Sequence, residues 1–336
     1  MRRRPARRSP LSLLLLGTGT FLLVLAPLLA WYVEPQARRT PLDVDVTTVF
    51  EGSGSYFDTA KVKLVEDEPL TVTRQVRGDV ADGDRSGRAV WDVSTSVDTA
   101  DTLPAADPHD SLQWTTERWV TDRKTNRPVH CCQEKPRFEG EAYLKFPFGV
   151  EKRSYRWWDS TLGGTVVLKY SGARAVQGYQ GLLFTGRVEA AQTGTRLVPG
   201  RLVGRPKSSQ VLAEEWYANH GVELVADQET GRILYAAIGP RKTLRAPGGK
   251  KDAMVLLDSR KLAFAPATQR AQVALARDDT DRLRLLGRTV PLVALPAGAV
   301  LFLAGAVLLV RGGRIRRGGQ AAPLPDTARH AAPAGR

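Results

Sequence analysis

The residues best suited to carry chemistry are two adjacent cysteines, Cys131 and Cys132, directly behind His130. Neighbouring thiols can form a disulfide within one chain, bridge to another chain, or stay unpaired. A metal site would need more ligands, and the chain has four histidines and no CxxC or HExxH pattern. We therefore expect a candidate disulfide at this pair, and neither a metal nor a cofactor.

An aromatic-rich segment follows, from Phe138 to Trp158. Aromatic side chains dominate grooves that hold an acyl chain, a glycolipid or a partner protein. They also fill cores, and we favour a core at the junction of two β units over an exposed surface. The candidate ligand or partner surface would consist of Phe146, Phe148, Tyr155, Trp157 and Trp158.

Patterns of known enzymes are missing from the sequence. There is no GxSxG elbow, Walker loop or dinucleotide fingerprint, and Gly52–Ser55 (GSGS) is typical of a flexible turn. His109 and His220 leave open a triad or carboxylate pair assembled in space, because Asp and Ser are plentiful. We predict that the protein is not an enzyme and keep an extracytoplasmic hydrolase as the third hypothesis.

The elements that must position these residues are mainly β-strands. Short apolar or β-branched runs end at Gly, Asp, Asn or Pro, as in sheet proteins. Seven runs qualify as strands: 70–76, 89–97, 113–120, 165–170, 181–189, 222–226 and 232–237. Over 267–286 the apolar residues alternate with charged residues at the period of a helix and not of a strand, which predicts a surface helix.

Two features recur along the β region. The turn-like segments Asp122–Arg127 (DRKTNR) and Asp227–Arg232 (DQETGR) are offset by 105 residues. The tripeptides Tyr56–Asp58 (YFD) and Trp157–Asp159 (WWD) are offset by 101 residues. Similar offsets predict two tandem β units, about 46–135 and 150–240, although convergent hairpin chemistry would give the same similarity.

Two apolar segments flank the β region. Leu11–Val33 and Val290–Val310 carry no charge and exceed the roughly 20 residues that a membrane-spanning helix needs. Arginines cluster before the first segment, in 1–10, and after the second, in the basic tail 311–336, which we expect to be disordered. This predicts a two-pass protein of the cytoplasmic membrane with both termini cytoplasmic and residues 34–288 extracytoplasmic. The alternative for the first segment is a cleaved signal peptide.

The basic charge belongs mostly to the two tails. They hold +10 of the net charge of +14, so the segment between the apolar stretches is nearly balanced. A nucleic-acid-binding protein carries a basic stripe on its folded domain instead. We therefore expect no nucleic-acid partner.

Taken together, several segments resemble the actinobacterial porin PorA family of two-pass membrane proteins. The resemblance rests on the two spans, on DRKTNRPVHCC (122–132) and above all on LKFPFGVEKRSYRWWDST (144–161). It covers nearly the whole chain and implies an envelope protein of a bacterium with an elaborate cell wall. Some members are associated with glycolipid transport and polar growth, and the resemblance supplies no catalytic residue.

We thus expect a mainly β (α+β) extracytoplasmic region flanked by two transmembrane helices. The preferred function is that of a non-enzymatic cell-envelope protein that binds a lipid, a glycolipid or an envelope transporter at the outer face of the cytoplasmic membrane. Membrane lipids are therefore expected partners. The alternative is an oligomeric, porin-like channel subunit. Neither span has a charged residue, whereas conducting paths usually keep polar groups.

Overall fold

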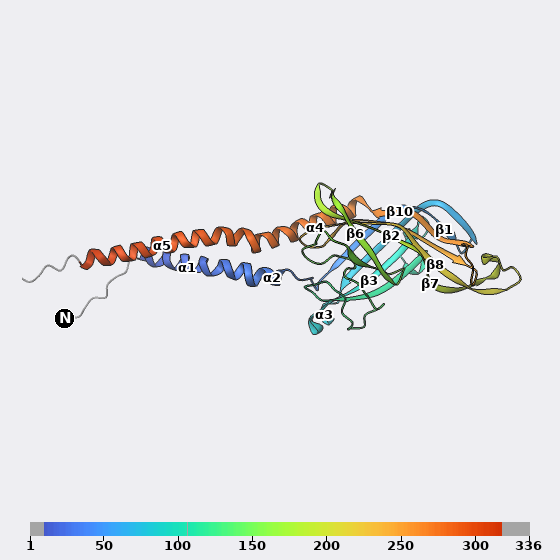
Figure 1. Ribbon diagram of the computed structural model, residues 1–336, viewed down its shortest axis with the longest axis horizontal. Helices are drawn as coiled ribbons and strands as arrows, with labels where there is room; N and C mark the ends of the chain where they lie inside the picture. The colour runs from blue at the N-terminus through green and yellow to red at the C-terminus, as the bar shows by residue number, and fades with distance from the viewer. Residues whose placement is uncertain (1–9, 106, 318–336) are drawn as a thin grey trace, which may run out of the picture. The chain divides into compact units, whose positions relative to one another are not determined.

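The computed structural model describes residues 10–105 and 107–317 and divides into two compact units (Figure 1). We call the described residues 10–37 and 283–317 the helical pair, and residues 38–282 the β domain. The expected basic segment 1–10, apart from Pro10, and most of the tail lie outside the described residues.

The helical pair contains the two apolar segments. Its helical stretches are α1 (Pro10–Leu28), the π-helical η1 (Leu29–Val33), α2 (Glu34–Ala37), the π-helical η5 (Leu285–Thr289) and α5 (Val290–Arg317). Two continuous helices, Pro10–Ala37 and Pro266–Arg311, are long and apolar enough to cross a membrane.

Small residues form the contact between α1 and α5. A Cβ atom on Gly19 would lie 2.5 Å from the backbone nitrogen of Phe302, and one on Gly305 would lie 2.8 Å from that of Leu16. Such close backbone approach is the usual way in which helices associate in lipid. The side chains exposed on this unit are mostly apolar, including Leu14, Phe21, Leu292, Val293, Val300 and Leu303. Their shared character suits contact with lipid tails.

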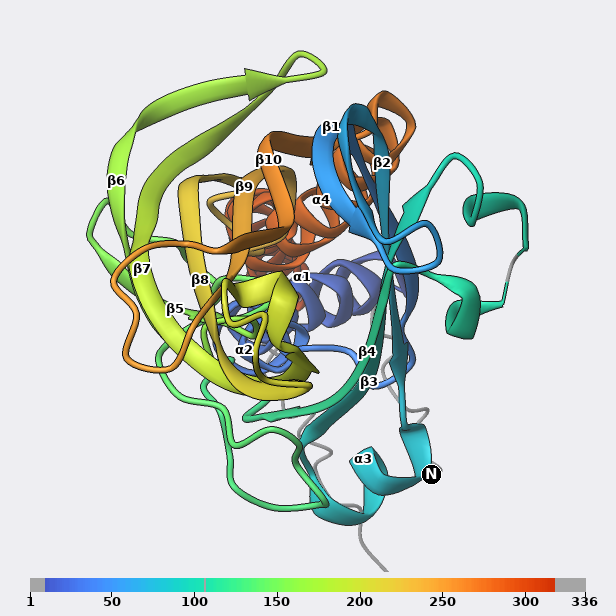
Figure 2. The same ribbon diagram turned by 90° about the vertical axis from the view of Figure 1, so that its right-hand side faces the viewer.

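The β domain is built on one antiparallel sheet in the order β4-β3-β2-β1-β10-β9-β8-β7-β6-β5. Figure 2 shows that the sheet is strongly curved. Its strands are β1 (Asp45–Asp58), β2 (Lys63–Gly78), β3 (Ala89–Thr99), β4 (Gln113–Thr121), β5 (Tyr155–Asp159), β6 (Gly164–Val176), β7 (Tyr179–Pro199), β8 (Gln210–Ala226), β9 (Ile233–Arg245) and β10 (Met254–Phe264). The short helices are α3 (Val80–Ser86), η2 (Leu103–Ala105), η3 (Pro108–Asp110) and η4 (Gly200–Val203).

The prediction of a mainly β region between two apolar helices is confirmed, and all seven predicted runs lie largely or wholly in strands. The expected flexible turn at Gly52–Ser55 is wrong, because these residues lie inside β1. Gly52 is needed there since a Cβ atom would lie 2.2 Å from the carbonyl oxygen of Lys261 on β10. The glycines thus permit close strand packing.

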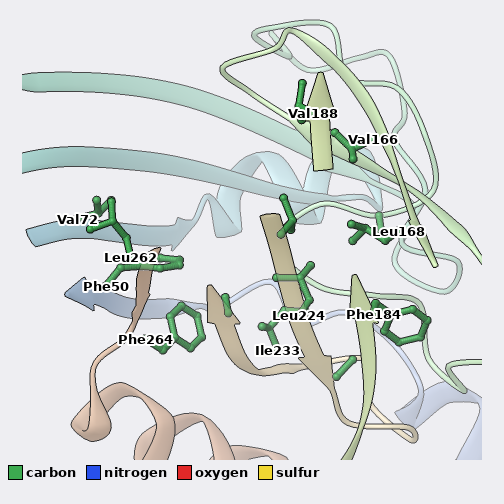
Figure 3. Close-up of a cluster of buried hydrophobic side chains, with 14 of the residues drawn as sticks. Phe50, Val72, Val166, Leu168, Phe184, Val188, Leu224, Ile233, Leu262 and Phe264 are labelled. Carbon is green, nitrogen blue, oxygen red and sulfur yellow. The ribbon is translucent and has the colours of Figure 1, made fainter. Parts of the chain in front are cut away.

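The main core is formed by buried side chains from most strands of the curved sheet. It joins Phe50 and Val72 at one side to Phe184 and Leu224 at the other (Figure 3). The rings of Phe50 and Phe264 meet edge to face, with their centroids 4.7 Å apart.

Helix α4 (Pro266–Arg284) covers the opposite face of β8 and β9. Its Val273 and Ala276 are buried against Val225 and Leu234. The predicted surface helix over 267–286 thus coincides closely with an observed helix that has one buried side.

Candidate functional site

The aromatic segment belongs mostly to the core. Phe146, Tyr155 and Trp158 are 0%, 2% and 3% exposed. The ring of Phe146 lies 4.7 Å from that of Phe184 and 5.1 Å from that of Tyr155. These three side chains are therefore part of the core and not exposed on the surface. Phe148 and Trp157 are only half-buried.

Two matching turns hold this segment in place. Asp122 donates its backbone N–H to Arg127 at 2.9 Å, and Asp227 donates its own to Arg232 at 2.8 Å. In both turns the aspartate carboxylate accepts the backbone N–H of the threonine three residues on, at 2.9 and 2.8 Å. The recurring Asp, Thr and Arg positions therefore have the same local structure.

The segment is bonded to both turns. The side-chain amide of Asn126 donates to the carbonyl of Lys145 at 2.8 Å, and the N–H of Phe146 donates to the carbonyl of Gly231 at 2.8 Å. Asn126 and Gly231 occupy equivalent turn positions and have φ values of 57° and 73°. The aromatic segment thus links β4 to β8 through these turns.

The YFD and WWD tripeptides also match. Each ends a strand, and the carboxylates of Asp58 and Asp159 both accept the backbone N–H groups two and three residues on, all at 2.9 Å. Each aspartate therefore stabilises the turn of a following hairpin.

The disulfide loop runs beside β4. Cys131 and Cys132 are bonded to one another, and no cysteine is free. The backbone of Arg118 donates to Lys135 at 2.7 Å and accepts from it at 3.1 Å, which attaches the loop to the edge of the sheet. The vicinal disulfide therefore lies at a turn between two isolated bridges, Thr121–Pro128 and Arg118–Lys135, that pair this loop with β4.

Arg118 organises the surroundings of this loop. Its guanidinium donates to Asp92 and Asp79 at 2.7 Å each, to Asp82, and to the carbonyl of Cys132 at 3.0 Å. Burial would lower the pKa of Arg118, but the hydrogen bonds to Asp79 and Asp92 outweigh it and raise that pKa. The pKa of Asp79 is lowered by the N–H of Asp82 and by Arg118. Arg118 and Asp79 therefore keep their charges at neutral pH.

A cleft of about 440 Å³ opens beside Arg118. We call it the Arg118 cleft. Its lining is polar apart from one valine, and comprises Gln75, Arg77, Asp92, Val93, Ser94, Thr116, Glu117, Arg118, Gln133 and Lys135. Next to it, the exposed Trp114 donates its indole N–H to Ser94 at 2.8 Å and contacts the ring of His109 at 4.8 Å. The arrangement offers hydroxyls, amides and charges beside one aromatic face.

Sequence reasoning missed this cleft. The partners of Arg118 come from β3, α3 and the disulfide loop, up to 39 residues away in the chain. The only local signals were two adjacent cysteines and an arginine in a predicted strand, and neither points to the other.

The histidines do not form a catalytic triad in the part of the chain that the structure describes. His109, His130 and His220 each contact a carboxylate, of Asp107, Glu134 and Asp258, at 2.9 to 3.1 Å. No serine hydroxyl hydrogen-bonds any of these three rings, and no group of metal ligands occurs among the described residues.

The comparison with protein-family models decides the family. The model described as Porin PorA matches residues 11–307, which is most of the chain. The chain belongs to the Porin PorA family. This membership, with the two apolar helices, associates the protein with a membrane and suggests a non-enzymatic, porin-like role. No curated protein matches the chain.

Proposed function

We propose that this Porin PorA family member is a non-enzymatic cell-envelope protein whose β domain binds the polar head group of a glycolipid in the Arg118 cleft. The observation that carries the proposal is the cleft itself. Head groups are recognised by convergent polar side chains, and Gln75, Ser94, Thr116 and Gln133 supply them. Trp114 adds a flat apolar surface beside them.

The helical pair supports a membrane location for that ligand. Its exposed side chains are mostly apolar, and small residues let its two helices pack closely as an anchor. The clustered arginines of 1–10 and 311–336 favour cytoplasmic termini, so the β domain would lie at the outer face of the cytoplasmic membrane. Phosphatase and fluorescent-protein fusions after residue 260 and at the C-terminus would test this orientation. An active phosphatase at the C-terminus would contradict it.

Native mass spectrometry tests the binding proposal. The intact chain, released from nanodiscs that contain lipid extract, should retain a glycolipid. Thr116→Trp should fill the cleft and remove that adduct, whereas Val167→Trp, at an exposed position on β6, should keep it. Equal adducts on both variants would place the ligand elsewhere.

A channel subunit is the second candidate, and the family match favours it. In the helical pair the exposed residues of each span are mostly apolar, so a water-filled path would need an oligomer with a different lining. Conductance measurements on the purified chain in planar bilayers would distinguish the two candidates. Reproducible unitary conductance that is abolished by substitutions in α1 or α5 would support the channel.

The matching turns also support a duplication. The proposed repeat pairs β1–β4 with β5–β8, since the Asp58 and Asp159 turns follow the first strand of each set. The Asp122 and Asp227 turns follow the fourth. Under this proposal the disulfide loop corresponds to β9, which would make the Arg118 cleft a specialisation of the first repeat.

A further inference from the structure

Two loops at one end of the β domain carry unpaired positive charge. The connection between β7 and β8 lies at the end of the domain away from α4 (Figure 1). It presents Arg201, Arg205 and Lys207, and the β9–β10 connection presents Lys250 and Lys251, all of them exposed.

The two loops form one surface, because they share a small core. Val203 of the first loop and Ala246 of the second pack in the same cluster with Ala213 and Leu244. The N–H of Gly248 also donates to the carboxylate of Glu214 on β8, at 2.8 Å. The basic side chains are therefore carried on a single ordered base.

Nearby carboxylates are already engaged. Asp252 is bonded to Arg241 and Arg245, at 3.2 and 2.8 Å, and Glu215 is bonded to Arg196. None of the five loop residues forms an ion pair within the described part of the chain. Their charge is thus available to a partner.

An apolar pair flanks the basic loops. Leu197 on β7 lies opposite Leu212 on β8, and the two are 59% and 55% exposed. Exposed leucines lose contact with water only if an apolar phase covers them. A lipid surface can supply both anionic head groups and that apolar phase.

We propose that this surface, termed the basic tip (Arg201, Arg205, Lys207, Lys250 and Lys251 with Leu197 and Leu212), docks on a lipid bilayer that contains anionic lipids. The basic side chains lie at the head groups, and the leucines enter the boundary with the acyl chains. A soluble polyanion would use the charges alone and leave the leucines in water. This site is separate from the Arg118 cleft, so neither proposal depends on the other.

The test uses the full chain in nanodiscs of phosphatidylcholine, immobilised and exposed to separate vesicles. Vesicles with 30 mol% phosphatidylglycerol in phosphatidylcholine should bind at least about tenfold more than pure phosphatidylcholine vesicles, with a decline in high salt. The charge-reversal variant R201E/R205E/K207E should lose this preference. The matched control K124E/R127E/K152E changes three exposed basic residues elsewhere in the β domain and should retain it.

Substitution of the two leucines distinguishes binding to a lipid surface from binding to a soluble polyanion. Leu197→Ser with Leu212→Ser should lower vesicle binding several-fold while leaving any capture on inorganic polyphosphate beads unchanged. Three outcomes would overturn the proposal: equal binding to neutral and anionic vesicles, equal losses in the charge-reversal variant and its control, or vesicle binding that survives the serine substitutions.

Discussion

Lys145 is the clearest example of a residue whose environment sets its properties. Burial lowers its pKa to about 7, and its ammonium lies 3.9 Å from the ring centroid of Phe148. The charge of Arg232 acts in the same direction, whereas Asp279 opposes it. The folded protein therefore holds this proton less tightly than the unfolded chain does.

This difference predicts a pH-dependent stability. Between about pH 7 and the pKa of an unfolded lysine, near 10.4, the unfolded state binds more protons, so raising the pH stabilises the fold. Lys145→Met should be more stable than the wild type at pH 7, and that advantage should shrink by about 1–3 kcal/mol by pH 10. Urea unfolding of the two detergent-solubilised proteins at each pH measures this stability difference. A difference that stays constant with pH would contradict the assignment.

Phe146 tests the core assignment of the aromatic segment. Phe146→Ala should lower the free energy of unfolding by about 3–5 kcal/mol, because the side chain is fully buried. Phe148→Ala should lower the free energy of unfolding by less, since Phe148 is only half-buried. If both variants keep wild-type stability and lose a ligand instead, the segment is a binding surface.

Arg118 should matter for stability as well as for the cleft. Arg118→Met leaves three carboxylates without their shared cation, and we expect a loss of about 2–4 kcal/mol, less than for a fully buried network because the partners are partly exposed. Arg77→Met removes an exposed pair with Asp45 and should change stability by less than about 1 kcal/mol. Chemical unfolding measures the free energy of unfolding of both variants. Equal effects would show that the network contributes little.

At the scale of elements, the packing of α1 against α5 depends on glycine. Gly298→Leu should separate the helices, since a Cβ atom there would lie 3.0 Å from the carbonyl oxygen of Gly19. Gly17→Leu is the matched control, because nothing lies within 4 Å of that position. Cysteine cross-linking between the helices should fall for the first variant only. Unchanged cross-linking in Gly298→Leu would argue against the close contact.

The sequence predicted the elements better than their connections. Alternating apolar residues revealed seven strands, and uncharged segments revealed both apolar helices, because these signals are local. β1 was missed since its glycines resemble a turn, yet they serve close contact with β10. The pairing of β1 with β10, which places the first and last strands together, depends on residues some 200 positions apart and leaves no local pattern.

The candidate site was harder to predict for the same reason. The cysteine pair was visible in the sequence, but the cleft that Gln133 and Lys135 of the same loop help to line depends on Arg118 and on carboxylates from two other elements. Aromatic composition alone could not separate a groove from a core, whereas the burial of Phe146, Tyr155 and Trp158 favours a core.

At the scale of the whole molecule, the proposed function is that of an anchored binding protein. The helical pair supplies an apolar exterior, and the β domain supplies a polar cleft and a basic tip. Porin PorA family membership fits a membrane role, and the proposed difference from a channel is that the ligand is held by the β domain.

The most direct measurement is site-specific photo-cross-linking in cells. A photoreactive amino acid at Thr116, in the Arg118 cleft, should form an adduct with the mass of a glycolipid, whereas the same group at Val167 on β6 should not. Adducts at both positions, or none at Thr116, would contradict the proposed binding site.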